Sequence, residues 1–117
     1  MEQLVKHDHA WGFTFSGDLN LRVDCLWRLL VSGRVAVTSE DHGHQFGLPA
    51  PVDCVSELRR RLGGLPVTAA SVRAGTVDVS LGFGDGGTLE VISTSAGYEA
   101  WVLSGRDLLM VGQPGYE

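Results

Sequence analysis

The chain has few cysteines and no long apolar segment, and both absences restrict the kinds of protein it can be. Cys25 and Cys54 are too few for a disulfide framework, and neither belongs to a Cys-x-x-Cys pair. No segment approaches the roughly 20 apolar residues that cross a bilayer. The polar start, up to His9, lacks the basic and then apolar pattern of a secretory signal. We therefore expect a cytoplasmic protein with two reduced thiols.

Basic residues are also scarce. Nine lysines and arginines stand against 14 acidic residues, which gives a net charge of −5 and a pI near 5.2. Such a charge repels phosphate backbones and anionic lipid surfaces, so neither nucleic acid nor a membrane is an expected partner. A basic protein partner would be attracted instead.

The four prolines are outnumbered by 16 glycines, a balance that favours many tight turns over disorder. A length of 117 residues suits one domain with its own core, spanning residues 1–117. The first nine residues are polar and bear two histidines, so we expect them to be flexible.

Alternating apolar residues predict a β-rich fold. The expected strands cover residues 11–15, 19–31, 34–38, 65–73, 76–83, 88–92, 98–103 and 108–111. Residues 98–103 are apolar on both faces, which is typical of a central strand. Residues 108–111 share this property and need cover from the helix, from the N-terminal strands or from a second copy of the chain.

One amphipathic helix is predicted at about residues 52–62, because Val52, Val55, Leu58 and Leu62 share a helical face. Pro51 suits the first helical position, and the glycines at 63 and 64 suit its end. The predicted fold class is α+β: a curved, mainly antiparallel sheet of about seven or eight strands, with this helix packed on it.

Residues 82–87, Gly-Phe-Gly-Asp-Gly-Gly, match the G-x-G-x-x-G fingerprint of dinucleotide-binding sites. In those sites the glycines precede a helix whose N-terminus receives the pyrophosphate. Here they precede the expected strand 88–92, so the pattern predicts a hairpin turn.

No set of residues predicts catalysis. The chain lacks a Gly-x-Ser-x-Gly elbow, and Cys54 lies beside the apolar face of the predicted helix, where a packing role is expected. Glu90 and Glu99 are expected to be exposed or paired with Arg73 or Arg106. We therefore expect a protein that is not an enzyme and needs no cofactor.

The connection at residues 39–51 is the longest irregular segment and the favoured candidate surface. It combines acidic, imidazole and aromatic groups, which makes it a candidate for partner binding. The candidate residues are Glu40, Asp41, His42, His44 and Phe46.

Metal binding is the alternative role for the histidines. His42 and His44 form one His-x-His pair, and His7 and His9 form another. Two imidazoles with this spacing on an extended strand could share a zinc or copper ion. Neither pair has a spacing that fixes the geometry, and solvated loop histidines are the simpler interpretation.

Four segments of the C-terminal half resemble a known family. They are residues 64–68 (Gly-Leu-Pro-Val-Thr), the hairpin at 81–89, residues 98–101 (Tyr-Glu-Ala-Trp) and the Pro-Gly-Tyr-Glu close at 114–117. The family is a group of small bacterial domains, most common in actinobacteria and without an assigned activity. It shows a Phe-x-Asp-Gly hairpin, a Tyr-Glu-Ala-Trp strand and a Pro-Gly-Gly-Glu close. Here Tyr116 replaces the second glycine of that close.

The resemblance covers residues 64–117 and, more loosely, 12–24. It implies a compact α+β domain with a build similar to immunity proteins that neutralise bacterial toxins, and it supplies no catalytic residues.

Two functions follow as hypotheses. The first is a non-enzymatic protein-interaction module, such as an immunity-like inhibitor. The alternative is a sheet-lined module that binds a small ligand or a metal through the His42 and His44 loop. Homodimerisation is compatible with both, because strands that are apolar on both faces need cover.

Overall fold

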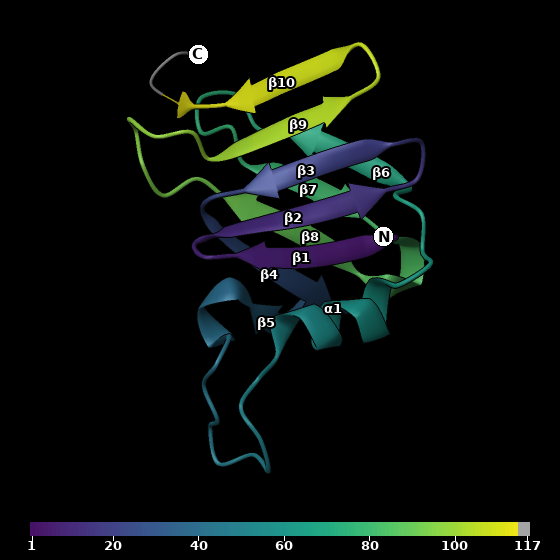
Figure 1. The fold of residues 1–117 in the computed structure, drawn as a ribbon, viewed down its shortest axis with the longest axis vertical. Helices are drawn as coiled ribbons and strands as arrows, with labels where there is room; N and C mark the ends of the chain where they lie inside the picture. The colour runs from purple at the N-terminus through teal and green to yellow at the C-terminus, as the bar shows by residue number, and fades with distance from the viewer. Residues whose placement is uncertain (115–117) are drawn as a thin grey trace.

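A computed structural model describes residues 1–114 of the chain as two antiparallel five-stranded sheets packed face to face, with one α-helix at their edge (Figure 1). The α+β class and the antiparallel pairing are as predicted, but the prediction of one curved sheet of seven or eight strands was wrong. The expected strand 19–31 is interrupted at Asp24 and Cys25, where the chain leaves one sheet and enters the other. The final three residues, including Tyr116, lie outside the described part.

The first sheet has the strand order β1-β2-β3-β9-β10. Its strands are β1 (Gln3–His7), β2 (Ala10–Phe15), β3 (Leu19–Val23), β9 (Trp101–Gly105) and β10 (Leu108–Gly112). The pairing of β3 with β9 joins the two ends of the chain in one sheet. The strand expected at 98–103 begins only at Trp101, and Tyr98 is instead exposed in the preceding connection.

The second sheet has the order β5-β4-β8-β7-β6. Its strands are β4 (Leu26–Val31), β5 (Arg34–Thr38), β6 (Ala69–Val72), β7 (Val79–Gly82) and β8 (Thr88–Ile92). Two of these, β5 and β8, have the bounds that alternation predicts. The pairing of β4 with β8 again joins distant parts of the chain.

The core lies between the two sheets, where every second residue of the inner strands points inward. Trp27 on β4 is fully buried and meets Trp11 of the opposite sheet edge-on, with ring centroids 5.2 Å apart. Phe13 on β2 meets the same indole at 6.1 Å. Aromatic edge-to-face contacts of this kind add to the stabilisation that burial of apolar area provides.

The N-terminus is part of this core, so the expectation that residues 1–9 are flexible was wrong. Leu4 is 2 % exposed, and β1 pairs with β2 along its whole length. The amino group of Met1 donates hydrogen bonds to the carbonyls of Leu62 and Leu65. The polar sequence misled the prediction, because in this edge strand only Leu4 is buried and the other side chains are exposed or half-buried.

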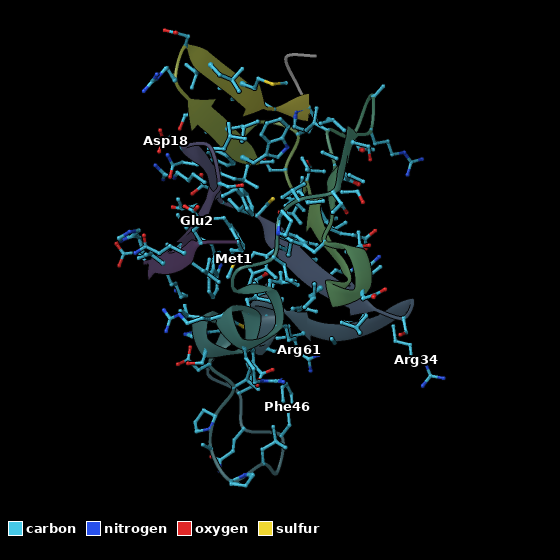
Figure 2. The ribbon with its side chains drawn as sticks, turned by 90° about the vertical axis from the view of Figure 1, so that its right-hand side faces the viewer. Met1, Glu2, Asp18, Arg34, Phe46 and Arg61 are labelled. Carbon is cyan, nitrogen blue, oxygen red and sulfur yellow. The ribbon has the colours of Figure 1, made fainter. Side chains whose placement is uncertain are left out.

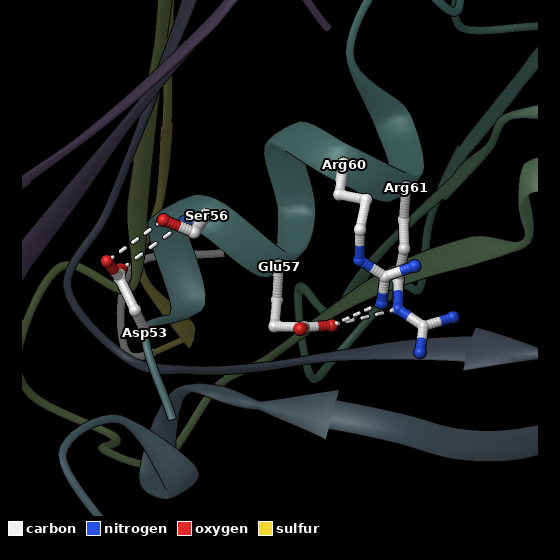
Figure 3. A network of polar contacts seen from close by, with 5 residues as sticks. All are labelled: Asp53, Ser56, Glu57, Arg60 and Arg61. Atoms are coloured by element: carbon white, nitrogen blue, oxygen red, sulfur yellow. Dashed lines mark hydrogen bonds and ion pairs between the residues drawn. The ribbon is translucent and has the colours of Figure 1, made fainter. Parts of the chain in front are cut away.

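Helix α1 (Cys54–Leu62) begins two residues later than predicted, because Asp53 is the N-cap. Its carboxylate accepts hydrogen bonds from the backbone N–H groups of Val55 and Ser56 and from the Ser56 hydroxyl (Figure 3). In the next turn Glu57 pairs with Arg60 at 2.7 Å and with Arg61 at 3.3 Å. Two of the three consecutive arginines at 59–61 are therefore paired at the helix surface.

The two ends of the sandwich differ. At one end α1 packs against β1 and β5 and covers the edges of both sheets. At the other end β6 and β10 are edge strands without a helix, and apolar side chains there remain exposed: Val72, Leu109, Met110 and Val111. No helix within residues 1–114 has the length and apolarity needed to cross a membrane.

The N-cap generates a stability prediction. We expect Asp53→Ala to lower the free energy of unfolding by about 1 kcal/mol, because two backbone donors lose their acceptor. Asp53→Asn should lose less, since its amide oxygen can still accept those bonds. Urea denaturation at neutral pH measures both variants, and equal stability of Asp53→Ala and the wild type would contradict the role of the cap.

The stabilisation that Asp53 provides depends on pH. Hydrogen bonds from Ser56 lower the pKa of Asp53 from its ordinary 3.8. Its stabilising effect is therefore present above 3.8 and is lost as the pH falls through the lowered value. In Asp53→Asn this part of the acid-side loss should be absent from a series of urea denaturations at decreasing pH.

Candidate functional site

A loop of residues 43–51, here called the protruding loop, projects from the helix end of the sandwich (Figures 1 and 2). It connects a short 3-10 turn, η1 (Ser39–Asp41), to α1. Its base is closed by two backbone hydrogen bonds of 2.8 Å, from Gly43 N–H to the Val52 carbonyl and from Val52 N–H to the His44 carbonyl. These hydrogen bonds hold the two ends of the loop together, and all nine of its residues are exposed.

The tip of the protruding loop is a tight turn that holds apolar side chains in solvent. The Leu48 N–H donates to the Gln45 carbonyl, and the Gln45 side-chain amide donates back to the Leu48 carbonyl, each at 2.8 Å. Phe46 has a φ of 49°, a left-handed conformation that is uncommon for a bulky residue. Phe46 is 66 % exposed and Leu48 is 49 % exposed. Strain and exposed apolar groups at one point are typical of a binding site.

The predicted acidic residues lie at the base of this loop and stabilise it. The Asp41 carboxylate accepts the N–H of Thr38 at 2.9 Å, and the Thr38 hydroxyl accepts the N–H of Glu40 at 3.2 Å. This is a capping box around η1. Asp41 is therefore a structural residue, whereas the Glu40 side chain is exposed.

His42 is also engaged within the protein. Its Nδ1 accepts the N–H of Cys54 at 3.1 Å, at the start of α1. Its ring meets the indole of Trp11 edge-on, with centroids 5.4 Å apart. His42, directly before the protruding loop, thereby joins the start of the loop to α1 and to the first sheet.

His44 and Phe46 are the two predicted residues that the structure brings together in solvent. Their rings stack with centroids 5.6 Å apart and an interplanar angle of 20°. Leu48 completes this apolar tip and was missed by the sequence analysis. Its signal was present, because a leucine between Gly47 and Pro49 in a polar loop has no strand or helix in which to be buried.

The hypothesis of a metal site requires several ligand side chains close together. Within residues 1–114, no three side chains of His, Cys, Asp or Glu lie together in a group that could hold a metal ion. His7 and His9 are exposed around the turn between β1 and β2. His42 and His44 differ in environment, since one is hydrogen-bonded to Cys54 and the other stacks on Phe46.

The two thiols are packed groups. Burial raises the pKa of Cys54 to about 12, and its Sγ donates to the Thr38 carbonyl at 3.3 Å. Burial likewise raises the pKa of Cys25 to about 12, with the nearby Asp24 carboxylate adding to the effect. A nucleophilic cysteine needs a lowered pKa, whereas the pKa of each of these thiols is raised.

The glycine-rich segment forms the predicted hairpin turn between β7 and β8. A Cβ on Gly87 would lie 2.2 Å from the Leu30 carbonyl oxygen, and its φ is 111°. Glycine is needed here for a close approach between strands. The segment leads into β8, so it lacks the helix N-terminus that a dinucleotide site requires.

The expected partner of Glu90 was wrong. Arg28, directly opposite on β4, pairs with Glu90 at 2.6 Å, in place of the expected Arg73 or Arg106. Cross-strand ion pairs of this kind stabilise a sheet modestly. Glu99 is exposed in the connection before β9.

The thiol environments predict low reactivity in the native state. At about pH 8, where an ordinary cysteine is partly ionised, we expect both thiols to react with Ellman's reagent at least tenfold more slowly than in denaturing urea. Absorbance of the released thionitrobenzoate measures both rates. One thiol reacting as fast in the folded protein as in urea would contradict the packed environment described for that residue.

Comparison with known proteins adds no relative: no family model, curated protein or solved structure matches the chain.

Proposed function

We propose that this protein is a non-enzymatic binding protein that recognises another protein through the tip of its protruding loop. The observation that supports this most directly is the exposure of Phe46 and Leu48 on a loop whose base and tip are both fixed by hydrogen bonds. Two large apolar side chains exposed on a projecting loop contribute nothing to the core of the domain. In an interface, such residues fill pockets on the partner.

The fixed shape of the loop favours tight binding. Association costs less when a recognition segment already has its bound conformation, because fewer torsions are ordered on binding. Here the capping box at Asp41, the His42 hydrogen bond and the Gln45–Leu48 turn hold successive parts of the segment. The arrangement resembles the presentation of a rigid loop by an inhibitor.

The charge around the loop indicates the chemistry of the partner. Glu40 and Asp53 are exposed at its two ends, and the whole chain has a net charge of −5. A partner with an apolar pocket inside a basic rim would complement both features. An immunity-like inhibitor of a basic toxin or nuclease is one protein of this kind, and it is the form of the proposal that the acidic charge favours.

The alternative, a metal or small ligand held by His42 and His44, has less support. The Nδ1 of His42 already accepts a backbone hydrogen bond. No observation in this loop favours an ion over a protein surface.

The source and location of the protein are also proposals. The two free thiols favour a reducing compartment, and we propose the cytoplasm. Membership of the bacterial family named above is likewise a proposal, and it rests on the sequence motifs around Phe83 and Trp101.

Site-specific crosslinking tests the proposed loop. p-Benzoylphenylalanine placed at position 46 should crosslink one protein in near-stoichiometric yield in a lysate of the source organism. The same group at position 98 is the matched control, because Tyr98 is an aromatic residue that is 80 % exposed elsewhere on the surface.

The captured protein should then bind the purified wild-type chain with a measurable affinity. The double variant Phe46→Ala and Leu48→Ala should bind at least 100-fold more weakly, which is the effect of losing hot-spot residues. Equal crosslinking from positions 46 and 98, or unchanged affinity of the double variant, would contradict recognition by the loop.

A further inference from the structure

A cavity of about 440 Å³ opens between the two sheets at the end opposite α1. Residues from both sheets form its walls. Those from the first sheet are Phe15, Ser16, Leu19, Leu21, Trp101, Leu103 and Met110, and those from the second sheet and its approach are Val67, Ala70, Ser71, Val72, Val79 and Leu81. The volume lies in the range of roughly 300–1,000 Å³ that small-molecule sites occupy.

The lining is apolar except at two serines. Ser16, in the turn after β2, supplies a hydroxyl group, whereas Ser71 lies opposite Ser80 on the face of β6 that also carries Ala69. No lining residue is charged. The indole N–H of Trp101 donates to the Val77 carbonyl at 2.8 Å, so this ring presents carbon atoms to the space. An apolar site with a few polar groups is the usual composition of a ligand pocket.

The cavity extends from the surface into the core. Val72 and Met110 are 49 % and 45 % exposed, whereas Leu21 and Trp101 are only 2 % and 3 % exposed. A flat protein surface laid across β6 and β10 would cover the first pair and leave the inner space unfilled. The depth therefore favours a small molecule that inserts between the sheets.

We propose that this cavity is a binding site for one uncharged, chain-like or flat apolar molecule with a hydroxyl or other neutral polar end. The apolar body contacts both sheets, and the polar end hydrogen-bonds to Ser16. A carboxylate in the same place would be buried without a cationic partner among the lining residues, at a large cost in desolvation. This site is separate from the protruding loop and does not depend on its function.

Two alanines on β6 provide a matched pair of variants. Ala70 lines the cavity opposite Leu81, whereas Ala69, its neighbour, lies opposite Gly82 on the other face of the strand. Both residues are exposed at a sheet edge, so a larger side chain is tolerated at either position. Ala70→Phe fills the cavity, and Ala69→Phe adds the same apolar surface outside it.

The probes are Nile red, 1-decanol and decanoate. We expect Nile red to bind the wild type with one site per chain and a blue-shifted emission, and 1-decanol to displace it. Ala69→Phe should behave as the wild type, whereas Ala70→Phe should bind at least tenfold more weakly. Decanoate at neutral pH should compete at least tenfold more weakly than 1-decanol.

A second pair of variants, on β10, tests the cavity independently if Ala70→Phe does not fold. Met110→Trp narrows the cavity, and Leu109→Trp is its outward-facing control, because Met110 lines the space and Leu109 does not. Circular dichroism identifies the folded variants. Equal Nile red binding by the members of a folded pair, or decanoate binding as tightly as 1-decanol, would overturn the proposal. A dimer in sedimentation experiments that binds no Nile red and persists in 1-decanol would show that a second copy of the chain covers this end. That result would also overturn the small-molecule proposal.

Discussion

The packing of one sheet face against the other is the constraint on which the structure depends. Trp27 lies at its centre, is fully buried, and contacts Trp11 and Phe13 of the opposite sheet. Because both faces must be apolar, each inner strand alternates. The chain changes sheets between β3 and β4, at Asp24 and Cys25, although the alternation of the sequence continues through this point. Its second crossing, between β8 and β9, returns the C-terminal strands to the first sheet beside β3.

The packing of two open sheets also explains why one end of the sandwich is covered and the other is not. A sandwich of two open sheets has four edge strands, and the single helix can cover only one pair, β1 and β5. The segment that leads into this helix forms the protruding loop, so the loop is anchored where the structure is most completely packed. The uncovered pair, β6 and β10, borders the apolar cavity. The two proposed binding surfaces therefore lie at opposite ends of the molecule, one fixed by hydrogen bonds and the other left by incomplete cover.

Local patterns predicted the local structure well. Alternation identified β8 with its correct bounds, and the glycine-rich turn before it was recognised from the strand that follows. The division into two sheets was missed because strand pairing, such as β3 with β9, joins residues about 80 positions apart and leaves no local signal. At the candidate site, composition indicated a segment that the structure shows as an exposed loop, but it could not separate His42, which packs on Trp11, from the exposed pair His44 and Phe46.

Native-state hydrogen exchange tests the central claim that the sandwich is closed by α1 and open at β6 and β10. Amide protection reports the free energy of local opening, which rises with burial and with the number of packed neighbours. The account predicts the slowest exchange for hydrogen-bonded amides of β2, β4 and β8, and exchange at least 100-fold faster in β6 and β10. Protection in β6 and β10 equal to that of β4 would contradict it, because the end described here as open would then be as tightly packed as the centre.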